Sequence, residues 1–110
     1  MSDSPIERMR ADATRSAIVE VLRTVYDPEI PVNIYDMGLI YDIKVTPDNK
    51  VDIKMTLTSP ACPVAGSLPG EVEHRIRAID GISEVALELV WDPPWTPEKM
   101  SEAARLQLNL

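Results

Sequence analysis

The fold is decided by residues 39–58, which read Leu39-Ile40-Tyr41-Asp42-Ile43-Lys44-Val45-Thr46-Pro47-Asp48-Asn49-Lys50-Val51-Asp52-Ile53-Lys54-Met55-Thr56-Leu57-Thr58. Both halves of this stretch alternate apolar and polar residues with a period of two, which is typical of half-buried β-strands. Between them, Pro47–Lys50 has the composition of a turn. We therefore expect a β-hairpin, in which Ile40 is the one break in the alternation.

A helix is predicted ahead of the hairpin, from Asp12 to near Tyr26. Its apolar positions recur at helical spacing and are Ala17, Ile18, Val21, Leu22 and Val25. The helix must stop there, because Pro28 disfavours the α conformation at Asp27. Residues 1–11 are expected to form a flexible tail.

The connection from Asp27 to Gly38 is predicted to be stiff and acidic. Two prolines restrict its backbone, and Asp27, Glu29 and Asp36 supply carboxylates. A helix stop followed by an ordinary turn would explain the same residues. From the residues alone, a structural turn and a part of a functional site therefore remain two open interpretations.

A second helix and a third strand are predicted after the hairpin. The helix has one apolar face, made of Ala65, Leu68, Val72, Ile76 and Ile79. Pro69 and Gly70 interrupt it, so either the helix kinks or a short first turn ends and the helix restarts near Ser67. Gly81 closes it as a left-handed cap. The alternation from Val85 to Trp91 then predicts a strand.

The chain beyond the third strand is predicted to be a C-terminal extension. Thr96 is suited to cap a short final helix with Pro97 at its first position, and a leucine-rich tail follows. The order is α-β-β-α-β, which predicts an α/β (α+β) fold with two layers. In it, two helices cover one face of a small three-stranded sheet. The expected division is a tail (1–11), a single domain (12–95) and the extension (96–110).

Cys62 is the only cysteine of the chain, and it lies between the predicted hairpin and the start of the predicted second helix. Pro63 follows it, at a place where proline suits a first helical position. A thiol at a helix N-terminus meets unpaired N–H groups and the positive end of the helix dipole, and both favour the reactive thiolate. The alternative interpretation is a small buried hydrophobic residue.

The composition excludes several classes of protein. The 110 residues carry a net charge of -7, which argues against binding to nucleic acid. No apolar segment of about 20 residues suggests a membrane span, and the N-terminus lacks an apolar signal segment. A single cysteine cannot form an internal disulfide, which fits a reducing compartment. We therefore expect a cytoplasmic protein without nucleic-acid or membrane partners.

The sequence does not favour an enzyme. His74 is the only histidine, and helical spacing places it on the solvent side, away from Cys62. No base is then available to activate the thiol. One cysteine also cannot hold an iron–sulfur cluster, which normally needs about four thiolates. Cys62 would bind metal only by sharing it, either between two copies of the chain or with a partner molecule.

Several separated motifs resemble the iron–sulfur cluster assembly (FSCA-type) domain family. They are Asp27-Pro28-Glu29-Ile30-Pro31-Val32-Asn33-Ile34, Asp36-Met37-Gly38-Leu39-Ile40, Met55-Thr56-Leu57-Thr58 and Ala61-Cys62-Pro63. The likeness covers about residues 14–92, and the extension, Val90–Pro97 through Met100-Ser101-Glu102, resembles the SufT branch. A sister branch serves assembly of the phenylacetyl-CoA oxygenase. Its members tend to carry further cysteines near the C-terminus, and this chain has none after Cys62.

The resemblance implies an accessory role in the maturation of iron–sulfur proteins, not turnover catalysis. The family's reactive cysteine corresponds to Cys62 and its acidic loop residues to Asp27 and Glu29, while Thr58 is a candidate supporting residue. The implied partners are iron–sulfur assembly proteins and recipient apoproteins, with a homodimer as one option. The monomer would bind no cofactor stably, only a cluster or iron in transit. The alternatives are an interaction module with a structural Cys62, and a maturation factor of the phenylacetyl-CoA oxygenase branch.

Overall fold

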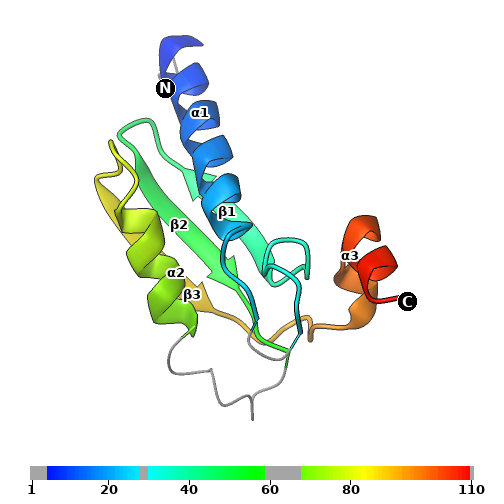
Figure 1. Cartoon of the computed structure of the whole chain (residues 1–110). Helices are drawn as coiled ribbons and strands as arrows, with labels where there is room; N and C mark the ends of the chain where they lie inside the picture. The colour runs from blue at the N-terminus through cyan, green and yellow to red at the C-terminus, as the bar shows by residue number, and fades with distance from the viewer. Residues whose placement is uncertain (1–4, 28–29, 59–67, 110) are drawn as a thin grey trace.

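The computed structural model describes residues 5–27, 30–58 and 68–109, and Figure 1 shows their arrangement. The elements follow the order α1 (Pro5–Leu22), β1 (Ile40–Val45), β2 (Lys50–Met55), α2 (Leu68–Arg77) and β3 (Glu84–Leu89). A 3₁₀ helix, η1 (Pro97–Lys99), and a short helix, α3 (Glu102–Gln107), end the chain. The predicted α-β-β-α-β order is therefore confirmed.

The sheet has three strands in the order β1-β2-β3. Strands β1 and β2 are antiparallel and form the predicted hairpin, and β3 lies parallel to β2. The register of β1 shifts between Ile40 and Asp42, so Tyr41 is an extra residue on that strand. This bulge is the physical reason why the alternation breaks at Ile40, since an inserted residue changes which side chains face the core.

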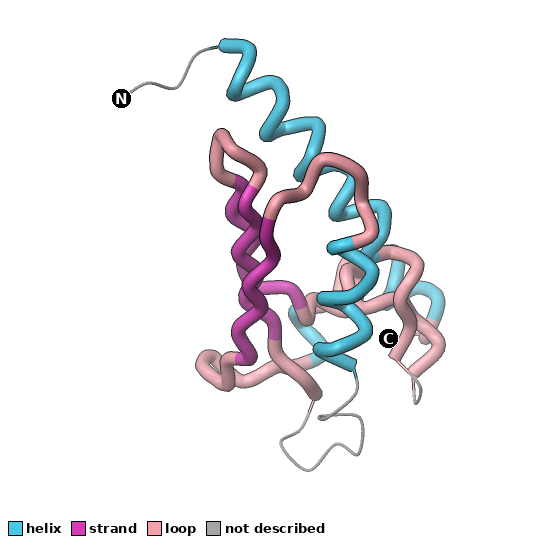
Figure 2. Tube along the Cα trace, turned by 90° about the vertical axis from the view of Figure 1, so that its left-hand side faces the viewer, coloured by secondary structure: helices cyan, strands magenta, loops and turns pink. Residues whose placement is uncertain are grey.

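Helices α1 and α2 cover one face of the sheet, as predicted, and Figure 2 shows them on the same side of the strands. The core forms between these two layers, because period-two strands and amphipathic helices each bury one side. Its fully buried members include Ile18 and Leu22 of α1, Ile53 of β2 and Ile76 of α2. The opposite face of the sheet carries charged residues that alternate in sign across the strands, such as Asp42 opposite Lys54 and Lys54 opposite Glu88.

The first helix begins earlier than the sequence predicts. Helix α1 starts at Pro5, not at Asp12, so residues 5–11 of the expected tail are helical. Proline is well suited to the first turn, and the residues that follow are mostly strong helix formers. This part of α1 buries little apolar surface, and periodicity therefore did not reveal it. The helix also ends at Leu22, slightly before the predicted end near Tyr26.

Helix α2 begins at Leu68, and Pro69 lies in its first turn, where its missing N–H needs no partner. This start agrees with the alternative in which the helix restarts near Ser67. The predicted helical start at Pro63 lies outside the described residues. Gly81 has the expected positive φ, 92°, but α2 already ends at Arg77, so Gly81 lies in the turn that follows the helix and does not cap it.

The C-terminal extension contains two short helices, so the prediction of one final helix is wrong. Pro97 does occupy the start of η1, but Met100 and Ser101 then adopt extended backbone angles and interrupt the helix. Ser101 starts α3 instead, and its hydroxyl accepts a hydrogen bond from the N–H of Ala104. Within the described ranges, every helix is too short or too polar to cross a bilayer.

Candidate functional site

The connection between α1 and β1 is a closed loop, which we call the acidic loop (residues 26–39). An isolated antiparallel bridge joins Tyr26, at the start of the loop, to Asn33 in its middle. The N–H of Ile34 donates to the carbonyl oxygen of Val25 at 2.8 Å, and the N–H of Asp27 donates to that of Val32 at 3.3 Å. These hydrogen bonds fix the backbone of the described part of the loop.

Asp27 lies at the start of the acidic loop and is only 5% exposed. Its Oδ1 accepts a hydrogen bond of 3.1 Å from the N–H of Ile30. A buried carboxylate with such a contact stabilises a turn, because it satisfies a backbone donor that would otherwise lack a partner. Asp27 therefore has a structural role at this position. Glu29, the other predicted acidic residue, lies outside the described residues.

A second turn in the acidic loop depends on Asn33 and Asp36. The N–H of Asp36 donates to Oδ1 of Asn33, and Nδ2 of Asn33 donates to Oδ2 of Asp36, both at 2.8 Å. Two residues later, Gly38 adopts a φ of 82°, which glycine tolerates best. Asn33 was not predicted as a turn residue, although the spacing of asparagine and aspartate three residues apart is typical of such turns.

The acidic loop is bonded to the end of strand β2. The N–H of Thr56 donates to the carbonyl oxygen of Leu39 at 2.8 Å, and the N–H of Leu39 donates to that of Ile34 at 3.2 Å. Thr58 follows, half-buried, and is the last described residue before residues 59–67. Cys62 belongs to that range, so the predicted functional thiol lies outside the described residues. What the structure establishes is that the chain enters this range from a strand end attached to the acidic loop.

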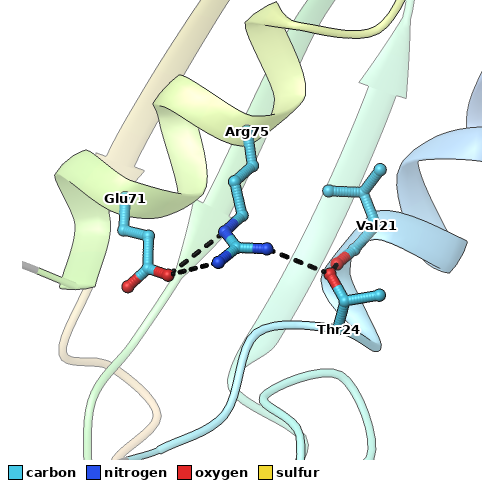
Figure 3. A network of polar contacts seen from close by, with 4 residues as sticks. All are labelled: Val21, Thr24, Glu71 and Arg75. Carbon is cyan, nitrogen blue, oxygen red and sulfur yellow. Dashed lines mark hydrogen bonds and ion pairs between the residues drawn. The ribbon is translucent and has the colours of Figure 1, made fainter.

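A polar network also links the two helices near this end of the molecule (Figure 3). Arg75 of α2 contacts Glu71 through Nε at 3.1 Å and through a terminal nitrogen at 3.0 Å. Its other terminal nitrogen donates to Oγ1 of Thr24, which itself donates to the carbonyl oxygen of Val21. Thr24 lies just before the acidic loop, and α2 follows residues 59–67. The network therefore joins the helical flanks of both segments.

The described residues contain no group of three or more histidine, cysteine, aspartate or glutamate side chains placed to hold a metal ion. His74 is exposed on α2, as predicted. Asp27 and Thr58 are placed at the same end of the fold by the backbone contacts above, but no hydrogen bond joins their side chains in the described part. The candidate site is therefore the end of the two-layer α+β domain at which the acidic loop meets the end of strand β2.

Comparison with known proteins shows the family. A family model described as "Iron-sulfur cluster assembly protein" matches residues 15–89. A protein of Porphyromonas gingivalis named "Fe-S protein maturation auxiliary factor" is 46% identical over 87% of this chain and 91% of its own length. The "Fe-S protein maturation auxiliary factor SufT" of Staphylococcus aureus is 34% identical over 78% of this chain and 98% of its own length.

A solved structure agrees with this result. A crystal structure from Bacillus anthracis, described as a domain of unknown function, DUF59, has a TM-score of 0.85 and 34% identity. It covers 94% of this chain and 98% of that one. The chain therefore belongs to the iron–sulfur cluster assembly protein family, and the predicted resemblance to its SufT branch is confirmed.

Proposed function

We propose that this protein is an accessory factor in the maturation of iron–sulfur proteins. The observation that carries the proposal is its membership of the iron–sulfur cluster assembly family over residues 15–89, together with close relatives named as maturation auxiliary factors. Those relatives match over nearly their whole length, so the proposal concerns the complete domain. The role is accessory, and the protein does not itself turn over a substrate.

Cys62 is the functional thiol in this proposal. Thiolates are soft ligands that suit iron and iron–sulfur clusters, and Cys62 is the only thiol the chain has. One thiolate leaves most cluster positions unfilled, so the remaining ligands must come from another molecule. A second copy, an assembly protein or a recipient apoprotein would each complete the site. The cluster or iron is therefore cargo in transit, and the monomer holds no resident cofactor.

Asp27, Glu29 and Thr58 are proposed as supporting residues. The buried carboxylate of Asp27 holds the turn at Ile30, which favours a role in shaping the acidic loop over direct binding of metal. Glu29 belongs to the same loop and would add negative charge beside the cargo. Thr58 is the last described residue on the approach to Cys62, and its hydroxyl is a candidate hydrogen-bond donor to the thiolate.

Partners are proposed on the same basis. Iron–sulfur assembly proteins would supply the cargo and recipient apoproteins would receive it, in the cytoplasm. The alternative is an interaction module in which Cys62 is merely structural and Trp91, Trp95 and the C-terminal tail form a partner surface. The indole N–H of Trp95 donates to the carbonyl oxygen of Met37, which favours a packing role for Trp95, whereas Trp91 is 41% exposed.

Anaerobic reconstitution with iron and sulfide tests the proposed thiol. We expect the wild-type protein to gain visible absorbance from a thiolate-bound cluster and to form a species of twice the monomer mass, or a mixed species when a small thiol is added. Cys62→Ser should remain folded by circular dichroism and gain neither signal. Equal cluster absorbance in the wild type and in Cys62→Ser would show that Cys62 is not the ligand.

A further inference from the structure

The C-terminal extension contacts the acidic loop at several places, and we call residues 93–109 the C-terminal clamp. The indole Nε1 of Trp95 donates a 2.7 Å hydrogen bond to the carbonyl oxygen of Met37. The N–H of Ser101 donates to the carbonyl oxygen of Asp36 at 2.8 Å. Two consecutive carbonyl groups of the loop therefore have their partners in the clamp.

The backbones of the clamp and the loop also touch directly. A Cβ added to Gly38 would overlap the carbonyl oxygen of Lys99, and that oxygen belongs to η1. Only glycine can occupy this position while the clamp stays in place, because both the positive φ and the close approach exclude a side chain. The requirement for Gly38 thus comes partly from the clamp and not only from the turn.

Three further contacts attach the clamp to the loop and to β1. The hydroxyl of Tyr41, at the bulge of β1, donates to the carbonyl oxygen of Pro93 at 2.7 Å, and the ammonium group of Lys99 lies 5.1 Å from the centre of the Tyr41 ring. Near the other end, Nε2 of Gln107 donates to the carbonyl oxygen of Pro31 at 3.0 Å. The clamp therefore spans the loop from Pro31 to the start of β1.

Apolar burial adds to these polar contacts. Met100 and Ala104 of the clamp are buried and belong to the same hydrophobic core as α1 and the sheet, and Leu108 packs against that core. The match to the family model ends at residue 89, so the clamp lies beyond the matched part of the chain. It is nevertheless packed as an integral part of the domain.

We propose that Trp95 is a positioning residue for the candidate site. Through its hydrogen bond to the carbonyl oxygen of Met37, it holds the acidic loop in the shape that the site needs. This inference rests on the proposed function for its biological meaning. The route is a series of hydrogen bonds: Trp95 bonds the carbonyl group of Met37, Leu39 bonds both Ile34 and Thr56, and Ile34 bonds Val25. We expect loss of the Trp95 donor to loosen the described part of the loop.

Hydrogen exchange of the Trp95→Phe variant tests the inference. Phenylalanine keeps a ring packed against the core but lacks the N–H donor, and Trp91→Phe is the matched control because Trp91 is 41% exposed. We expect the amides of Gly38, Leu39 and Asp27 to exchange roughly fivefold faster in Trp95→Phe, as for the loss of one net hydrogen bond. They should match the wild type in Trp91→Phe. Equal exchange in both variants would overturn the proposal.

Gly38→Ala provides a second variant, which disturbs the clamp from the loop side at a different contact, the one between Gly38 and Lys99. Because the Trp95–Met37 and Lys99–Gly38 contacts belong to one interface between clamp and loop, the two substitutions should be non-additive in the exchange of the loop amides. Strictly additive effects would show that Trp95 does not act through this interface. Trp95→Phe should also lower the activity of iron–sulfur enzymes in cells, whereas Trp91→Phe should not.

The two proposals fail in different ways. Normal iron–sulfur enzyme activity in a Cys62→Ser strain would contradict the proposed function and leave the exchange results standing. Normal activity in Trp95→Phe, together with a loss of activity in Cys62→Ser, would contradict the positioning role alone.

Discussion

Gly38 and Lys99 are 61 positions apart in the sequence, yet the backbone of the first lies against the carbonyl oxygen of the second. The contact places the C-terminal clamp directly on the acidic loop. It joins a loop that lies within the residues matched by the family model to an extension that lies beyond them. A substitution at Gly38 therefore tests whether the clamp packs against the acidic loop.

Gly38→Ala should destabilise the protein by about 2–4 kcal/mol, because alanine combines strain at positive φ with overlap at Lys99. Gly70→Ala is the control, since a Cβ at Gly70 meets nothing within 4 Å. Helix propensity predicts that this control is neutral or more stable by up to about 1 kcal/mol. Urea unfolding measures both. A Gly38→Ala variant as stable as the wild type would show that the clamp does not pack against the loop.

Truncation of the two isoleucines of α1 should change the free energy of unfolding by very different amounts. Ile18 is fully buried, and Ile18→Ala should cost about 2–5 kcal/mol through lost burial and the cavity left behind. Ile6 lies on the early part of the same helix and is 69% exposed. Ile6→Ala should change the free energy of unfolding by less than about 0.5 kcal/mol. Similar losses at both positions in urea unfolding would mean that the start of α1 is packed.

The hydrogen bond of Asp27 predicts a difference between two substitutions. Asp27→Ala removes the acceptor for the N–H of Ile30 and should cost about 1–3 kcal/mol, whereas Asp27→Asn keeps a carbonyl oxygen and should cost less. Asp80→Ala, at an exposed position after α2, is the control and should be nearly neutral. If Asp27→Asn is as destabilising as Asp27→Ala in thermal unfolding, the charge of Asp27 matters more than its acceptor.

Tyr41 predicts a pH effect at the clamp. Burial raises the pKa of its phenol above the ordinary value of 10.0, and the negative charge of Asp92 raises it further. Above this ordinary value the unfolded chain releases the proton first. The stability that Tyr41 contributes is therefore fully present below pH 10 and is lost as pH rises through the folded pKa.

Asp92→Asn isolates the smaller of the two causes. In an NMR titration of the Tyr41 ring, the pKa in this variant should lie below that of the wild type but still above 10.0, because burial remains. An unchanged pKa would mean that Asp92 does not face the phenol.

The sequence predicted those elements whose signals are local. The hairpin of residues 39–58 carries a period-two pattern with a turn between its halves, and Gly81 has the positive φ that its position predicts, although α2 ends earlier, at Arg77. The start of α1 was missed, because residues 5–11 form a helix through propensity and not through a buried stripe. The break at Ser101 was missed for a similar reason, since a serine cap within a short segment resembles any polar position.

The candidate site was predicted only in part. The acidic loop and the family resemblance follow from Asp27 and its neighbouring motifs, which are contiguous in the sequence. The attachment of Trp95 to Met37 joins two distant segments through a side chain and a backbone carbonyl, and no local pattern encodes such a pairing. The predicted roles of Cys62 and Glu29 remain predictions.

The most direct test of the account is iron–sulfur enzyme activity in cells whose only copy of this protein is Cys62→Ser. We predict that these activities fall to the level of a strain lacking the protein, while the variant and the recipient apoproteins accumulate normally. Wild-type activity in the Cys62→Ser strain, combined with reduced activity in the strain lacking the protein, would contradict the central role of the thiol.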